Sequence, residues 1–232
     1  MTKKILVTGF PHCGTTILRA LVGNCKNVQD QSIEFGDPVN YDANSSFEFY
    51  VWKHPFLHRE FRDFGFLHKP NTQFKDTIII PIIRNPWNVF TSLHKRGLHN
   101  EDFSVEDDRQ GHSAPYYLNS AERIYEVMEN PIKDVYPIRY EDVFENNFEK
   151  LKSIFDSIGL EYDDTTFDNS SKAFKHNNVS YVNDVKTKYD NEYRVWQINQ
   201  PIQNMNGEIS VPIEIDKKLQ QSSIVAKLGY KN

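Results

Sequence analysis

The sequence predicts an α/β fold: one P-loop-like domain over residues 1–232, with three layers in which helices flank a central, mostly parallel sheet. Short apolar runs, of the kind buried in parallel sheets, alternate with segments of helical periodicity. A glycine-containing loop stands between the first apolar run and the first helical segment. The length of 232 residues is enough for one good-sized domain whose core needs no disulfide staples.

Compact apolar segments predict the strands, which are expected at 5–7, 47–52, 77–83 and 135–138. The run at 77–83 is the most strand-like, because it is apolar throughout, as in a strand that helices cover on both faces. The first run ends at Gly9, which begins the glycine-containing loop.

Helical periodicity predicts the helices, which are expected around 18–22, 55–67, 86–93, 116–128, 143–158 and 215–228. Pro86 suits the first turn of its helix, and Gly159 is expected to end the helix over 143–158. Polar segments with weak periodicity predict loops at 98–114 and 163–212.

Composition restricts the function classes. The 27 basic and 32 acidic residues leave a net charge of −5, so no global basic field would hold nucleic acid. Two cysteines do not form an extracellular disulfide framework. The first apolar run is too short for a signal peptide, and no run approaches the ~20 residues of a membrane span. We therefore expect a cytoplasmic protein without a membrane span.

The strongest local signal is the segment Gly-Phe-Pro-His-Cys-Gly-Thr-Thr at 9–16, between a predicted strand and a predicted helix. The spacing from Gly9 to Gly14 is typical of a loop whose backbone amides hold a phosphate at a helix N-terminus. A nucleotide kinase would carry lysine at position 15, where Thr15 stands. The loop therefore predicts an anion site that lacks this lysine, and an ordinary glycine turn is the alternative.

Segments spread over nearly the whole chain resemble, in order and spacing, the sulfotransferases that use 3′-phosphoadenosine 5′-phosphosulfate (PAPS). Pro-His-Cys-Gly-Thr-Thr at 11–16 is similar to their 5′-phosphosulfate loop, Pro-(Arg/Lys)-Ser-Gly-Thr-Thr. Arg84 follows an apolar strand and Ser92 stands eight residues later, as in their 3′-phosphate motif. Further similar segments are Ile-Arg-Tyr-Glu-Asp-Val at 138–143 and Lys-Leu-Gly-Tyr at 227–230. The tyrosylprotein and carbohydrate types look closest.

The resemblance implies a set of PAPS-binding residues: Pro11, His12, Cys13, Gly14, Thr15, Thr16, Arg84, Ser92 and Tyr140. The planar guanidinium of Arg84 would lie at the strand edge where ligands bind in open α/β sheets, and it suits a phosphate. A surface salt bridge is the alternative for Arg84, and a packing role is the alternative for Tyr140. We interpret Arg139 as a solvated charge outside the site.

The resemblance also suggests catalytic residues. Lys53, in Lys-His-Pro at 53–55, is similar to a family lysine near the sulfuryl group and would stabilise charge on the leaving oxygen; a solvent-facing lysine is the alternative. His12 stands where relatives carry a permanent cation. Glu34 is the first candidate for the general base, because the tyrosylprotein type places a glutamate near this position. Further base candidates are His54, Asp30 and His58.

We therefore expect a sulfotransferase that moves a sulfuryl group from PAPS, as co-substrate, to a hydroxyl of a small molecule or glycan. No metal is expected, because the His and Cys spacings match no common ligand pattern. The alternatives are a P-loop nucleoside or nucleotide kinase and a nucleotide-binding module without turnover. The identity of the acceptor and the oligomeric state do not follow from the sequence.

Overall fold

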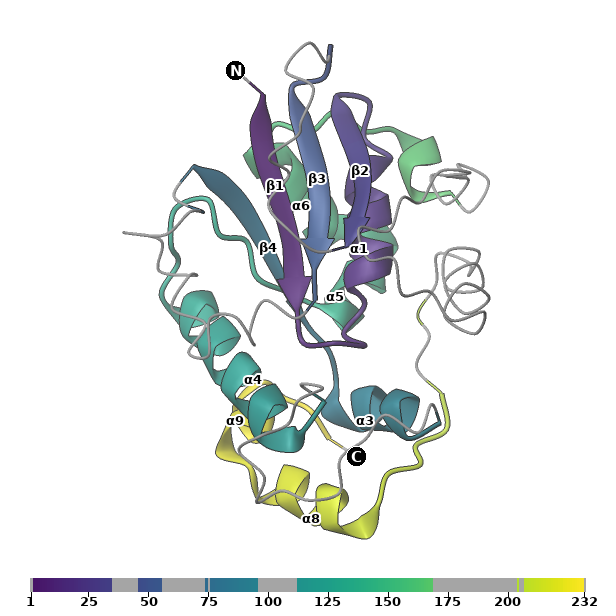
Figure 1. Ribbon diagram of the computed structural model, residues 1–232, viewed down its shortest axis with the longest axis vertical. Coiled ribbons are helices and arrows are strands. Elements are labelled where there is room, and N and C mark those ends of the chain that lie inside the picture. The colour runs from purple at the N-terminus through teal and green to yellow at the C-terminus, as the bar shows by residue number, and fades with distance from the viewer. Residues whose placement is uncertain are drawn as a thin grey trace, which may run out of the picture.

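The computed structural model describes residues 2–34, 46–55, 74, 76–95, 112–168, 204 and 207–231, with the backbone alone at 31–34. The strands are β1 (Lys3–Gly9), β2 (Val28–Glu34), β3 (Phe49–His54), β4 (Thr77–Ile83) and β5 (Ile138–Arg139). They form one parallel sheet in the order β2-β3-β1-β4-β5. Figure 1 shows the first four of these strands side by side. The predicted fold class is confirmed.

The centre of the sheet is apolar because both of its faces are covered. Every residue of β3 and β4 is buried, and so are the last five residues of β1. In a parallel sheet such strands read as continuous apolar runs, which is why 77–83 could be recognised in the sequence.

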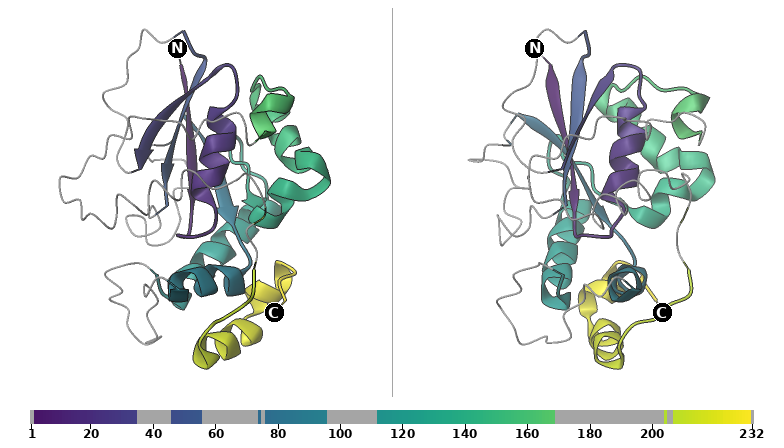
Figure 2. Two further views of the ribbon diagram at one scale, coloured as in Figure 1. Left: turned by 90° about the vertical axis from the view of Figure 1, so that its right-hand side faces the viewer. Right: turned by 45° about the vertical axis from the view of Figure 1, so that its right-hand side comes forward.

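The helices are α1 (Thr15–Gly23), α3 (Pro86–Lys95), α4 (Ala114–Glu129), α5 (Tyr140–Phe144), α6 (Glu149–Ile158), α8 (Ile213–Gln221) and α9 (Ser223–Lys227), with short 3-10 helices at Glu145–Phe148 and Asp164–Phe167. Helices α1 and α6 lie on one side of the sheet (Figure 2). Helices α3, α4, α8 and α9 gather beyond the carboxyl ends of β1 and β4, where the chain also ends (Figure 1). This end of the sheet carries the candidate site.

Strand β2 was not predicted from the sequence. Its segment, Val-Gln-Asp-Gln-Ser-Ile-Glu, has only two apolar residues and shows no strand periodicity. Pairing with β3 holds it in the sheet, with Val28 opposite Phe49 and Asp30 opposite Val51. A buried ion pair, with 3.6 Å between the Nε of Arg19 and the Oδ1 of Asp30, connects this strand to helix α1.

The single helix expected over 143–158 is wrong, because the chain is interrupted between α5 and α6. Asn146, Asn147 and Phe148 have φ values of 45°, 56° and 64°, a left-handed turn that no right-handed helix can include. Asparagine tolerates this conformation best among residues with a side chain. Phe148 is held there by ring contacts with Phe144 and Phe167, at centroid distances of 5.9 and 4.8 Å. The predicted end at Gly159 is confirmed, with φ 89°.

Several other boundaries differ from the predictions, and β3 is shifted by two residues from the expected 47–52. The closing helix expected over 215–228 is two helices, because Ser222 has extended backbone angles. The strand expected over 135–138 is reduced to β5, and Val135 forms only an isolated bridge with Ile79. Helix α4 begins at Ala114, inside the expected loop. The helix expected over 55–67 and most of the loops expected at 98–114 and 163–212 lie outside the described residues.

Candidate active site at the carboxyl edge of the sheet

The parallel register brings most of the predicted site residues to one edge of the sheet. Strand β1 ends at Gly9, where the loop begins, and β4 ends just before Arg84. Lys53 and His54 end β3, and the backbone of Glu34, at the end of β2, lies opposite Lys53. Ligands bind at this edge in open α/β sheets because the loops that leave the strands diverge there.

The loop between β1 and α1 has a conformation that only particular residues allow. A Cβ on Gly9 would overlap the carbonyl oxygen of Ile82, and one on Gly14 would overlap the ring of Tyr140. Gly14 also has a φ of 97°, which is strained for any residue with a side chain. The glycines are therefore required by close packing and backbone angle, which is more than an ordinary turn needs.

Lys53 is buried against the loop. Its side chain is 4% exposed, and its ammonium donates a hydrogen bond to the hydroxyl of Thr16, 2.6 Å away. Thr15 and Thr16 are also buried, at the first turn of α1. The interpretation of Lys53 as a solvent-facing lysine is excluded.

Arg84 lies across the other side of the loop. It is 7% exposed, donates to the backbone carbonyl of His12 at 3.3 Å, and lies over the ring of Tyr140 at 4.2 Å. A surface salt bridge is therefore excluded for Arg84. Tyr140, only 2% exposed, packs against both Gly14 and Arg84, so it fills a packing role beside the predicted phosphate groups.

The imidazole of His12 connects the loop to α3. Its Nδ1 lies 2.7 Å from the hydroxyl oxygen of Ser92, the residue expected to contact the 3′-phosphate. His12 has a φ of 67°, a strained angle for a residue with a side chain, and such strain clusters at functional sites. The ring of His12 also packs edge-to-face with that of His112, with 6.3 Å between the ring centroids. The sequence did not indicate this neighbour.

The side chain of Cys13 is not accessible to solvent. It is fully buried, and burial raises the pKa of its thiol to about 12 despite the nearby charge of Arg84. The thiol is therefore neutral at physiological pH, and a neutral thiol is a poor nucleophile. Cys13 contributes packing, and its backbone N–H closes a turn within the loop by donating to the carbonyl of Phe10 at 3.1 Å.

The base candidates separate by position. Asp30 is buried in its ion pair with Arg19, away from the carboxyl edge, so this candidate is disfavoured. His54 lies at the edge and is 5% exposed, and its carbonyl accepts a hydrogen bond from Thr8 at 2.9 Å. Glu34 has its backbone at the edge beside Lys53. His58 lies outside the described residues.

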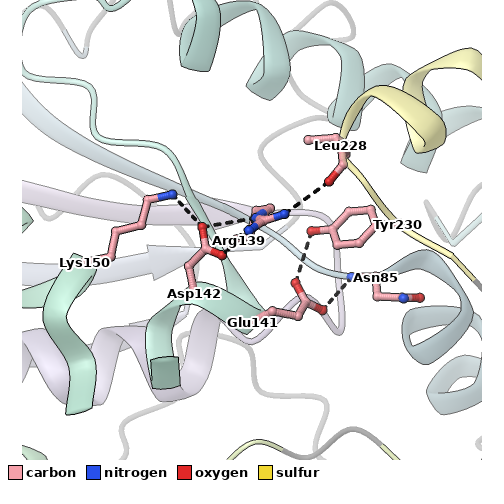
Figure 3. Close-up of polar contacts among 7 residues, drawn as sticks. All are labelled: Asn85, Arg139, Glu141, Asp142, Lys150, Leu228 and Tyr230. Carbon is pink, nitrogen blue, oxygen red and sulfur yellow. Dashed lines mark hydrogen bonds and ion pairs between the residues drawn. The ribbon is translucent and has the colours of Figure 1, made fainter. Parts of the chain in front are cut away.

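A second polar cluster lies next to the turn that carries Arg84 (Figure 3). The sequence did not indicate this cluster. Glu141 accepts hydrogen bonds from the backbone N–H of Asn85 at 2.9 Å and from the hydroxyl of Tyr230 at 3.1 Å. Arg139 is 35% exposed and pairs with Asp142, which is 3% exposed, so Arg139 is an ion-paired residue and not only a solvated charge. Arg139, Glu141 and Asp142 all lie in the segment 138–143, which resembles a sulfotransferase segment. That resemblance did not reveal their contacts with the last residues of the chain.

The described residues contain no cluster of His, Cys, Asp or Glu that could hold a metal ion. Within the same part of the chain, no helix has the length and apolar character needed to cross a bilayer.

The chain is similar to known proteins in its sequence and in its fold. A model of the sulfotransferase domain matches residues 2–201. The sulfotransferase domain of the Synechococcus PCC 7002 olefin synthase is similar in structure, with 12% identity, a TM-score of 0.54, and coverage of 100% of this chain and 96% of that one. The sulfotransferase domain of the curacin biosynthetic pathway has 14% identity, a TM-score of 0.48, and coverage of 100% and 99%.

Mouse sulfotransferase SULT7A1, solved in complex with PAP, has 16% identity and a TM-score of 0.43. That match covers 71% of this chain and 61% of the mouse chain, less than two thirds of its length. Among curated protein sequences, none matches significantly. The domain model nevertheless spans most of the sequence, and the chain belongs to the sulfotransferase domain family.

Proposed function

We propose that this sulfotransferase uses PAPS as the sulfuryl donor and a hydroxyl group of a small molecule or glycan as the acceptor. The observation that carries the proposal is the contact between the two predicted phosphate subsites. Arg84 donates to the carbonyl of His12, and the ring of His12 meets Ser92. Residues expected at the 3′-phosphate therefore touch the loop expected at the 5′-phosphosulfate.

The residues present fit such a ligand. Gly14 lets the ring of Tyr140 pack directly against the loop. The N-terminus of α1, which begins at Thr15, would offer backbone amides to an anion. The guanidinium of Arg84 is buried and planar, which suits two parallel hydrogen bonds to a phosphate. Thr15 replaces the lysine of a nucleotide kinase, and so the loop favours sulfuryl over phosphoryl transfer.

In the proposed reaction PAPS supplies an activated sulfuryl group. The loop amides, Thr15 and Thr16 bind the 5′ side, and Arg84 with Ser92 binds the 3′-phosphate. The acceptor oxygen attacks sulfur as the bond from sulfur to the bridging oxygen breaks. The acceptor proton passes to a base on the protein. Lys53 stabilises the negative charge that develops on the bridging oxygen.

We assign the base to Glu34, with His54 as the second candidate. The register supports this choice, because the backbone of Glu34 lies opposite Lys53. A glutamate at this place is the arrangement that resembles the tyrosylprotein type, so we extend the proposal to that mechanistic type. We further propose that residues 1–232 act as a single domain.

Replacing Arg84 with alanine tests the proposal. We expect the affinity for adenosine 3′,5′-diphosphate, measured by calorimetry, to fall by roughly 2–4 kcal/mol, as for a lost charge-assisted pair. Binding of adenosine 5′-phosphosulfate, which has no 3′-phosphate, should hardly change. Arg123→Ala is the matched control, since Arg123 pairs with Glu126 on the surface of α4. Equal losses for both ligands would contradict the assignment of Arg84.

A further inference from the structure

The carboxylate of Glu141 connects the turn after β4 to the end of the chain (Figure 3). One oxygen accepts the backbone N–H of Asn85 at 2.9 Å, and the other accepts the hydroxyl of Tyr230 at 3.1 Å. The carbonyl of Arg84 accepts the hydroxyl of the buried Tyr117 at 2.6 Å. The peptide unit between Arg84 and Asn85 is therefore held at both its N–H and its C=O.

The last residues of the chain pack against the same turn. The side-chain amide of Asn85 donates to the carbonyl of Lys231 at 3.2 Å, and Arg139 donates to the carbonyl of Leu228 at 3.3 Å. Burial, and then the charge of Glu141, raise the pKa of Tyr230, so its hydroxyl remains a donor at physiological pH. Tyr230 thus fixes the carboxylate of Glu141, which in turn accepts the backbone N–H of Asn85.

We infer that Glu141 is a positioning residue for recognition of the 3′-phosphate, and that Tyr230 acts through it. A guanidinium makes two parallel hydrogen bonds to a phosphate only when its plane is oriented toward the oxygens. The peptide unit after Arg84 fixes the backbone from which that side chain extends. Without the Glu141 carboxylate, the N–H of Asn85 loses its acceptor and this peptide unit can rotate. The inference rests on the proposed role of Arg84.

The alternative is that Glu141 contributes to stability alone. One ratio separates these roles: the affinity for adenosine 3′,5′-diphosphate divided by the affinity for adenosine 5′-phosphate, which lacks the 3′-phosphate. Loss of stability alone lowers the melting temperature and leaves the ratio for the folded protein unchanged. A displaced Arg84 lowers the ratio.

The experiment measures both affinities by calorimetry, and the melting temperature, for the full chain and four variants. Glu141→Ala should lower the ratio by about tenfold, because small displacements of a positioned group have large effects. Tyr230→Phe, which removes one hydroxyl and keeps the ring, should lower it by about threefold, a smaller effect because the bond to Asn85 survives. Glu141→Gln keeps an acceptor oxygen for Asn85 and should retain most of the preference. Tyr162→Phe is the matched control, since that hydroxyl bonds to Asp156 on an exposed surface.

Each outcome decides the inference. Ratios that fall in Glu141→Ala and Tyr230→Phe but not in Tyr162→Phe support it. A wild-type preference for the diphosphate that all variants keep overturns the role of Glu141 and leaves that of Arg84 intact. A wild-type protein without any preference overturns the role of Arg84, and the inference with it. If Glu141→Ala does not fold, Tyr230→Phe decides, and an unchanged ratio in that variant overturns the inference.

Discussion

The ammonium of Lys53 lies 2.6 Å from the hydroxyl oxygen of Thr16, so a buried polar contact connects the end of β3 to the first turn of α1. Burial of a cation is unfavourable unless other groups stabilise its charge. A lysine that is 4% exposed beside the loop between β1 and α1 is placed to meet the negative charge of the donor that we propose binds there. The contact therefore favours a role in the reaction over a role at the surface.

Lys53→Ala should reduce turnover by about a hundredfold, the effect of removing one group that stabilises developing charge in a transition state. The affinity for adenosine 3′,5′-diphosphate should change much less, because Lys53 acts mainly when the sulfuryl group leaves. Steady-state kinetics and calorimetry on the same preparation measure the two effects. Lys217→Ala is the control, since Lys217 pairs with Glu214 on the surface of α8. A loss confined to affinity would instead assign Lys53 to ground-state binding.

The thiol of Cys13 should not react in the native protein. It is fully buried with a pKa of about 12, and burial likewise raises the pKa of Cys25 to about 12. Because the thiolate is the reactive form, a disulfide reagent at about pH 8 should modify both cysteines only after denaturation. A Cys25→Ser variant isolates the signal of Cys13. Rapid modification of that variant in its native state would show that Cys13 is accessible and ionised.

Asp142 should contribute to stability in a way that depends on pH. Burial acts to raise the pKa of its carboxyl, but hydrogen bonds from Arg139 and Lys150 outweigh burial and lower it. A lowered pKa in the folded state gives stability that is present above the unfolded value of about 3.9 and is lost as pH falls through the folded value. The free energy of unfolding of the wild type should therefore fall more steeply below about pH 4 than that of Asp142→Asn. Parallel curves would contradict this role.

Sequence alone was enough for a strand that is apolar along nearly its whole length. Strand β4 was predicted with both bounds correct because every one of its residues is buried. Strand β2 has no such pattern, since its place depends on pairing with β3 and on the distant partner Arg19 of Asp30. The interruption between α5 and α6 depends on ring contacts with Phe167, which no local periodicity reveals.

The candidate site divides in the same way. The loop and Arg84 could be proposed from local motifs, because each follows directly from a strand. The contacts of Glu141 with Asn85 and Tyr230 span 56 and 89 positions, so no local spacing predicts them. His112 lies beside His12 only because α4 begins near the loop in space. Such residues are found from the fold.

His12 stands where the sulfotransferase loop motif that this sequence resembles has arginine or lysine. Its backbone is left-handed, with φ 67°, and its Nδ1 lies 2.7 Å from the hydroxyl oxygen of Ser92. A lysine or arginine at this position would be a permanent cation, whereas an ordinary imidazole is charged only below about pH 6.5. Bound phosphate and sulfate groups favour the charged imidazole. His12 is therefore expected to act as a cation in the complex with the donor.

On this basis the turnover of the wild type should decline on the alkaline side of neutrality, as the imidazolium loses its proton. His12→Lys places a fixed cation on the same backbone and should retain activity while flattening the alkaline limb of the pH–rate profile. His12→Ala removes the cation and the contact with Ser92, and should lower turnover by about a hundredfold at every pH. Initial rates at saturating donor measure all three profiles. Full activity of His12→Ala with the wild-type profile would show that His12 only shapes the loop, which would leave Lys53 and the backbone amides to stabilise the charge.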